Sequence, residues 1–339
     1  MKFQVEFSEI TKGLVQFNEQ KALMLTDKVC RGDLTRIDAI NSMVSTHYHG
    51  GPMWGGEECF NTLYKNSSVL VSFSRPEQLK KVIKVASDVV LDNGAFPNWK
   101  NAKRKNLIVD WDAYWTKFYM WILAHIGSIN WFVAPDVIEG TEEENDELLS
   151  RIPSSLKHKA VPVWHSVESI DRLVRLCEQW PRVAIGLCGP HEKTMSKPAQ
   201  DRLEEAFKAI YIDRDIDVKI HGLRMLDGRV LGKFPLDSAD STNVSINVPK
   251  WVIKYPEIGS HIIEKWNTDR GYKFDGVKSF YSIARVDEWG IPYYSDEFIE
   301  FKADKSVIAE LKMYRTAVLK GAVESVTPPT IKEWIISKK

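Results

Sequence analysis

Three short apolar runs of this sequence end near aspartates, and these carboxylates are the residues best placed to do chemistry. Asp92 follows Val-Val-Leu, Asp136 follows Ala-Pro, and the run from Phe234 to Ser241 contains Asp237 and Asp240. A carboxylate at the end of a buried strand has few structural reasons to be there, and in a barrel of parallel strands all such ends meet at one mouth. The pattern therefore predicts a catalytic site of converging aspartates.

A pair of carboxylates suits substitution at the anomeric carbon of a sugar. One carboxylate is the nucleophile and holds a glycosyl intermediate, while the other moves the proton. Residues three apart on an extended strand point to opposite faces, so only one of Asp237 and Asp240 can face the mouth unless the chain bends there. Asp92 and Asp136 also have structural alternatives. Asp92 could cap the next turn, and Asp136 could cap a helix that begins near Thr141.

The eight histidines supply the main competing hypothesis. His47 and His49 share one face of an extended segment, and His165 and His221 end predicted strands. A metal held by histidines would make the chain a barrel hydrolase of the amidohydrolase kind. However, Gly-Gly-Pro after His49 indicates a loop, and the other spacings fit no short metal motif, so we expect no metal and no cofactor.

Planar and basic side chains follow Asp92 closely. Phe96 and Trp99 are near enough in sequence to stack on a planar base, and a basic run comes next, in a segment expected to be a loop after the third strand. Beside a barrel mouth such a run is a candidate phosphate contact. The candidate phosphate-binding residues are Lys100, Lys103, Arg104 and Lys105.

Strands that alternate with amphipathic helices must position these groups. Most of the apolar runs are continuous, as in strands that are covered on both sides. The expected strands are Ala39–Ser45, Ser68–Ser74, Val89–Phe96, Asn130–Val137, Ala160–His165, Val183–Cys188, Val218–Gly222 and Phe234–Asp240. Helical patterns cover Pro76–Ser87, Val167–Trp180 with Ser166 as its N-cap, and Asp201–Tyr211. Because about eight strands alternate with helices, the sequence predicts an α/β fold, a closed (β/α)8 TIM barrel.

The barrel is expected to be the catalytic core over residues 39–248. Residues 1–38 look like an added N-terminal β layer rather than a signal peptide. Residues 249–339 form a helical or irregular C-terminal extension that packs on the barrel, for which closure of the barrel, cover over its mouth and homodimerisation are all open.

Composition limits the partners. The chain of 339 residues has 46 basic and 46 acidic side chains, so nucleic acid would have to bind at a local patch. The four scattered cysteines indicate free thiols in a cytoplasmic protein, and no run of about 18 apolar residues predicts a membrane span.

Several short motifs resemble those of one enzyme family. Leu-Asp-Asn-Gly-Ala-Phe at 91–96 resembles a motif of the tRNA-guanine transglycosylases, and Ser-Ala-Asp-Ser at 238–241 resembles the form found in their DpdA-type relatives, which insert 7-deazaguanines into DNA of phages and bacteria. Weaker matches lie in order between them, at 134–136, 161–165, 184–187 and 221–223. The resemblance covers roughly residues 40 to 245 and implies the same barrel.

The resemblance also implies roles. Asp240 would be the nucleophile that displaces guanine from C1′, with Asp237 as its rival because archaeal relatives show Asp-Ser-Ala, and Asp92 would be the general acid/base. The base would be bound by Asp136 and by the backbone of Gly186 and Leu187, and His165 stands where the family commonly has Gln. Phe96, close to Asp92 in the sequence, is the candidate ring to stack on the base. The tRNA enzymes carry a Cys/Cys/Cys/His zinc site after this region, whereas the last cysteine here is Cys188.

The expected function is therefore exchange of guanine in DNA for a preQ0-like 7-deazaguanine base. A tRNA-guanine transglycosylase is the nearest alternative. A histidine-metal hydrolase and a non-catalytic nucleic-acid-binding barrel are alternatives from other classes.

Overall fold

The computed structural model describes residues 47–51, 57–242, 244–245, 316–317, 320–321, 323–324 and 326–338. The expected β layer at 1–38, the strand at 39–45 and the boundaries at 38 and 248 lie outside these residues. The chain divides into two compact units, and residues 66–241 belong to the first, together with Tyr48 and the end of the chain from Val326. All the aspartates of the candidate site belong to this unit.

A nine-stranded sheet, in the order β5-β4-β3-β2-β1-β9-β8-β7-β6, forms the centre of the fold. All strand pairs with a described register are parallel. The strands are β1 (His47–Gly50), β2 (Ser68–Ser72), β3 (Asp88–Asp92), β4 (Phe132–Val133), β5 (Ala160–Val161), β6 (Val163–His165), β7 (Arg182–Gly186), β8 (Lys219–Leu223) and β9 (Ser238–Ser241).

The two edges of this sheet are consecutive in the chain, because only Pro162 separates β5 from β6. Strand β5 pairs with β4 and β6 pairs with β7, and the Pro162 carbonyl still accepts a hydrogen bond from Ala184 N at 2.8 Å. Proline has no N–H to donate, which splits one expected strand into two. The sheet is therefore nearly closed, and the fold is an α/β barrel-like fold consistent with a TIM-like barrel.

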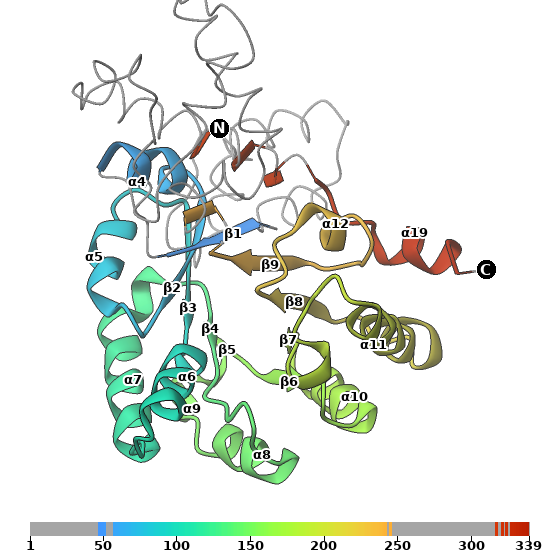
Figure 1. Ribbon diagram of the computed structural model, residues 1–339, viewed down its shortest axis with the longest axis horizontal. Helices are drawn as coiled ribbons and strands as arrows, with labels where there is room; N and C mark the ends of the chain where they lie inside the picture. The colour runs from blue at the N-terminus through green and yellow to red at the C-terminus, as the bar shows by residue number, and fades with distance from the viewer. Residues whose placement is uncertain are drawn as a thin grey trace, which may run out of the picture. The chain divides into compact units, whose positions relative to one another are not determined.

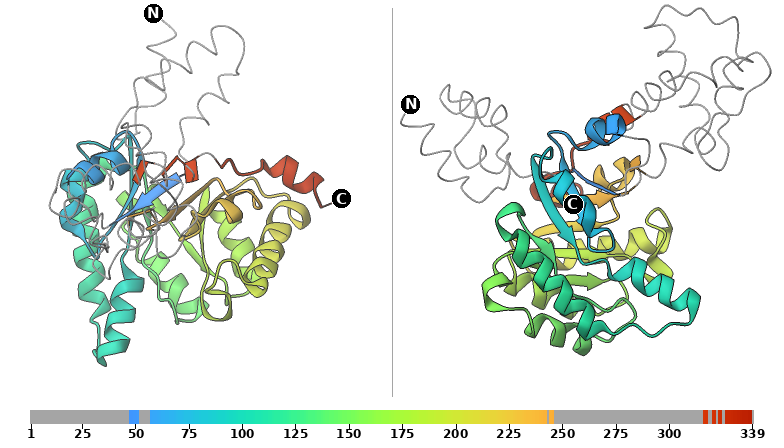
Figure 2. Two further views of the ribbon diagram at one scale, coloured as in Figure 1. Left: turned by 45° about the horizontal axis from the view of Figure 1, so that its top comes forward. Right: turned by 90° about the vertical axis from the view of Figure 1, so that its left-hand side faces the viewer.

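Helices lie outside the strands, as Figure 1 and the further views in Figure 2 show for α5, α7, α10 and α11. The described helices are α4 (Glu57–Tyr64), α5 (Leu79–Val82), α6 (Ala95–Lys105), α7 (Trp111–His125), α8 (Glu142–Ser150), α9 (Ser154–Lys157), α10 (Ile170–Gln179), α11 (Lys197–Lys208), α12 (Gly228–Leu231) and α19 (Ile331–Ile336). Across the described ranges, none of them combines the length and the apolar character that a membrane crossing requires.

Several expected boundaries were wrong. Strand β3 ends at Asp92 and Ala95 already begins α6, so the basic run after it is helical rather than a loop. The N-cap of α10 is Ser169, whose hydroxyl accepts from Arg172 N, and not Ser166. Strand β9 begins only at Ser238, so the expected strand residues 234–237 lie before it in an irregular segment.

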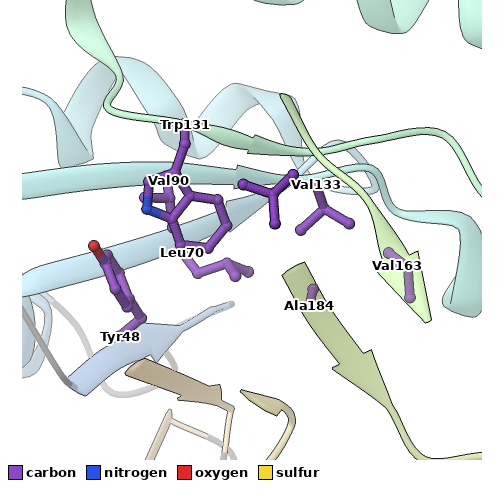
Figure 3. Close-up of a cluster of buried hydrophobic side chains, with 8 residues drawn as sticks. Tyr48, Leu70, Val90, Trp131, Val133, Val163 and Ala184 are labelled. Carbon is purple, nitrogen blue, oxygen red and sulfur yellow. The ribbon is translucent and has the colours of Figure 1, made fainter. Parts of the chain in front are cut away.

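Inward-facing side chains fill the barrel in a layer. Tyr48, Leu70, Val90, Trp131, Val133, Val161, Val163 and Ala184 form one buried cluster, and Figure 3 shows how these side chains meet. Side chains alternate along a strand, so the residue two positions after an inward one also points inward. Asp92, His165 and Gly186 each stand two positions after a member of this cluster, which places them in the next layer toward the carboxyl ends of the strands.

Candidate active site

Three carboxylates lie at the carboxyl ends of the strands, and two of them act electrostatically on the third, Asp92. Asp92 is the last residue of β3, Asp240 is near the end of β9, and Asp136 follows β4. Burial raises the pKa of Asp92 to about 6, and the negative charges of Asp240 and Asp136 add to the shift, while the Ser72 hydroxyl and Gly94 N–H oppose it. Such a carboxyl group can hold or release a proton near neutral pH, as a general acid/base must.

The turn after Asp92 is built to fix this carboxylate. Gly94 N donates to Asp92 Oδ2 at 3.0 Å, so Asp92 does cap the turn as well. Gly94 has φ +70°, and a Cβ there would lie 2.7 Å from both Ser74 N and Tyr114 Oη, so glycine is required for conformation and for space. The capping role and an acid/base role are compatible, because the pKa of Asp92 remains raised with this bond in place.

Asp136 is held by side chains of two neighbouring strands. Asn93 Nδ2 donates to its Oδ1 at 2.7 Å, and His165 Nε2 lies 2.8 Å from its Oδ2. Asp136 is not the cap of the following helix, because Thr141 caps α8 with its own hydroxyl in a capping box with Glu144. The helix-capping role expected as the alternative for Asp136 is therefore wrong.

His165 connects Asp136 to a buried chain of charges. Its Nδ1 lies 3.2 Å from Glu168 Oε1, and Arg172 Nη1 donates to Glu168 Oε2 at 2.6 Å. Burial alone would lower the pKa of His165, but its hydrogen bonds to Asp136 and Glu168 outweigh burial and raise the pKa to about 10. The imidazole is thus protonated at neutral pH and Asp136 faces a cation.

Asp240 has a different environment. The backbone N–H of Arg224 donates to its Oδ1 at 2.8 Å, and Arg224 adopts a left-handed φ of +58° that a non-glycine residue rarely takes. His221 Nε2 lies 3.4 Å from the same oxygen. Burial lowers the pKa of His221 although Asp240 opposes this shift, so Asp240 faces a neutral ring rather than a cation.

Asp237 lies at the other end of the barrel. It precedes β9, and its carboxylate pairs with Arg182 at 2.5 Å and with Lys219 at 3.9 Å. Arg182 and Lys219 are the first residues of β7 and β8, so Asp237 is at the amino ends of the strands. The structure therefore brings Asp240, and not Asp237, to the end where Asp92 lies.

The aromatic and basic residues of α6 occupy positions beside this end. Arg224 Cζ lies 4.5 Å from the centre of the Phe96 ring, and Lys100 Nζ lies 5.6 Å from it, so the ring is covered by cations. Lys103 lies over Trp99 and forms an exposed ion pair with Glu139 at 2.8 Å. Lys100, Lys103, Arg104 and Lys105 are exposed on the helix.

The remaining base-binding candidates end the strand next to His165. Gly186 closes β7 and is paired in register with His165, and Leu187 follows it.

Sequence reasoning missed Asn93, Glu168 and Arg224. Glu168 stands three positions after His165, and this spacing could have revealed the contact between the two side chains. Nothing in the sequence marks the left-handed backbone of Arg224.

The two early histidines lie on a strand, β1, as the extended segment expected for them requires. His47 Nε2 is 2.8 Å from the Val326 carbonyl, and His49 Nε2 is 3.0 Å from Glu324 Oε1. Among the residues that the structure describes, no group of three or more His, Cys, Asp or Glu side chains could hold a metal ion.

Comparisons with known proteins add no family to this description. A scan of the chain against models of protein families found no match. Searches of curated proteins and of solved structures found no significant match either. Any functional assignment therefore rests on the motifs of the chain and on the geometry of this site.

Proposed function

We propose that this protein is a transglycosylase that exchanges guanine in DNA for a 7-deazaguanine base through a covalent aspartyl–nucleotide intermediate. One observation carries the proposal: the three carboxylates at the carboxyl ends of the strands have three different environments, and the charges of two of them act on the third, Asp92. Asp92 has a pKa near neutrality, Asp136 faces a protonated imidazole, and Asp240 accepts a backbone N–H beside a neutral imidazole. Base exchange at C1′ requires a proton carrier, a base-binding anion and a nucleophile.

The first half-reaction uses Asp240 and Asp92. An Asp240 oxygen attacks C1′, the bond from C1′ to N9 of guanine breaks, and its electron pair goes to the departing base, which receives the proton of Asp92. In the second half-reaction Asp92 takes the proton of the incoming base, the base nitrogen attacks C1′, and the electron pair of the C1′–O bond returns to Asp240. The cycle consumes no cofactor and leaves the protein unchanged.

Asp136 would recognise the base. Guanine and 7-deazaguanines present N–H donors on their pairing edge, and a buried carboxylate accepts them well. Its present partners, Asn93 and His165, hold the carboxylate in place. Gly186 and Leu187 would offer backbone groups, and Phe96 would stack on the base once Arg224 moves from its ring.

Resemblance to the DpdA-type enzymes favours DNA over tRNA as the polymer. The last cysteine of the chain is Cys188, so the cysteine-rich zinc site of the tRNA enzymes has no counterpart after the barrel. The exposed cations of α6, beside Phe96, are the proposed phosphate contacts. The tRNA enzyme remains the alternative function because the same three carboxylates would serve it equally.

Incubation with a labelled 7-deazaguanine and either duplex DNA or tRNA tests the proposal. Label should enter DNA, with release of one guanine for each base inserted. Label in tRNA alone would replace the substrate by the alternative. Label in neither polymer, with stoichiometric zinc or iron found by elemental analysis, would favour the histidine-metal hydrolase.

A further inference from the structure

A chain of polar contacts crosses the barrel interior from Asp237 to Asp240. Arg182 Nη1 donates to Asp237 Oδ2 at 2.5 Å and to Ser238 Oγ at 2.9 Å. Ser238 Oγ lies 2.9 Å from His221 Nδ1, and His221 Nε2 lies 3.4 Å from Asp240 Oδ1. Ser238 and His221 are fully buried, so these contacts replace hydration.

The contacts of His221 favour one tautomer. An arginine can only donate, so Ser238 Oγ accepts from Arg182 and keeps one hydrogen to donate to His221 Nδ1 at 2.9 Å. In the other tautomer the hydroxyl would accept from Nδ1, and the lone pair of Nε2 would face the Asp240 carboxylate at 3.4 Å and be repelled by it. Because burial and the nearby Arg182 cation disfavour the charged ring, we assign the single proton of the neutral imidazole to Nε2.

This Nε2–H group has no satisfied partner among the described residues, although it is buried. At 3.4 Å from Asp240 Oδ1 it attracts the carboxylate, but the two groups are not aligned for a full hydrogen bond. Trp131 and Tyr48 pack edge-on against the imidazole, with ring centres 4.8 and 5.8 Å away, and hold its plane. An unsatisfied buried donor is costly, so its retention beside Asp240 calls for a reason.

We propose that His221 is a positioning residue whose Nε2–H is directed at Asp240 by Arg182 and Ser238, and that it binds the carboxylate most strongly when Asp240 leaves C1′. This inference rests on the proposed function. In the covalent intermediate the ester oxygens of Asp240 carry less charge, and the negative charge returns when the C1′–O bond breaks. A fixed neutral donor stabilises that developing charge without neutralising the nucleophile as a cation would.

Two measurements test this proposal. Nitrogen-15 NMR of the imidazole reports the tautomer directly, and we expect His221 to be neutral with its proton on Nε2. The Ser238→Ala variant should lose this exclusive preference. A wild-type ring that is protonated, or that carries its proton on Nδ1, would overturn the arrangement whether or not the protein exchanges bases.

Two substitutions separate positioning from packing. In His221→Gln the amide nitrogen can replace Nε2, whereas in His221→Asn it can replace only Nδ1. We expect kcat for exchange to fall on the order of 100-fold in His221→Asn with little change in KM, and to recover largely in His221→Gln. Equal losses in two folded variants would overturn the role of the donor. Absence of exchange by a wild type with the expected tautomer would instead overturn the proposed function.

Discussion

Replacement of Asp92 by asparagine should stabilise the protein while it removes the proposed acid/base group. Burial, with the charges of Asp240 and Asp136, raises the pKa of Asp92 from 3.8 to about 6. The unfolded chain loses this proton at lower pH, so the folded state binds it more tightly, and stability falls as the pH rises between the two pKa values. A shift of about two pKa units corresponds to at most roughly 3 kcal/mol above the folded pKa.

Urea denaturation of the wild type and Asp92→Asn at about pH 4.5 and about pH 8 measures this penalty. At about pH 4.5 the ionisation of Asp92 destabilises the wild type by only about 1 kcal/mol. The difference in the free energy of unfolding between Asp92→Asn and the wild type should therefore grow by about 2 kcal/mol at about pH 8. Asp237→Asn is the matched control, because it breaks ion pairs with Arg182 and Lys219 and should cost about 1–3 kcal/mol. An advantage of Asp92→Asn that does not grow with pH would refute the reasoning.

Four further predictions concern activity and DNA binding. Formation of the adduct should slow as the pH rises through about 6, because Asp92 must be protonated to release guanine. Attack by the incoming base should accelerate over the same range, because Asp92 must then accept a proton. Rapid-quench measurement of each half-reaction checks both expectations. Asp240→Asn should abolish exchange and leave DNA affinity nearly unchanged, since a nucleophile contributes little to ground-state binding. In Asp136→Ala the exchange of guanine-type bases should fall far more than the loss of thermal stability of the variant would explain. Exchange activity and thermal stability are measured on the same preparation. Joint replacement of Lys103, Arg104 and Lys105 by alanine should weaken DNA binding. The slope of the logarithm of the binding constant against the logarithm of the salt concentration should become shallower by about one unit for each phosphate that these side chains neutralise in the wild type.

The basic-run variant has a matched control in and just after α5. Lys80, Lys81 and Lys84 are also exposed, and their joint replacement by alanine removes the same charge from a different segment. Equal loss of DNA affinity in both triple variants would show a general charge effect rather than a phosphate site on α6.

The barrel could be predicted from the sequence because buried parallel strands leave continuous apolar runs. The runs around Val69, Val89 and Val183 each became a strand within a few residues of the expected position. Strand ends were less predictable. The split at Pro162 follows from a residue that the sequence shows, since proline has no N–H to donate. The early start of α6 at Ala95 depends on contacts with other segments, and a single chain segment does not contain that information.

The candidate site was predictable in part for the same reason. Asp92, Asp136 and His165 stand at the ends of apolar runs, and the structure brings them together. The sequence could not decide between Asp237 and Asp240 by geometry, since the choice depends on where β9 starts relative to β7 and β8. The tautomer of His221 depends on a serine and an arginine from other strands, so only a three-dimensional description reveals it.

Mass spectrometry of a trapped covalent intermediate tests the central claim most directly. The protein is mixed with guanine-containing DNA without an incoming base, quenched by denaturation and digested with protease and nuclease. We expect a nucleotide adduct that has lost guanine, attached to the peptide that contains Asp240, and no adduct with Asp240→Asn. An adduct mapped to another residue, or exchange that proceeds normally in Asp240→Asn, would contradict the proposed mechanism.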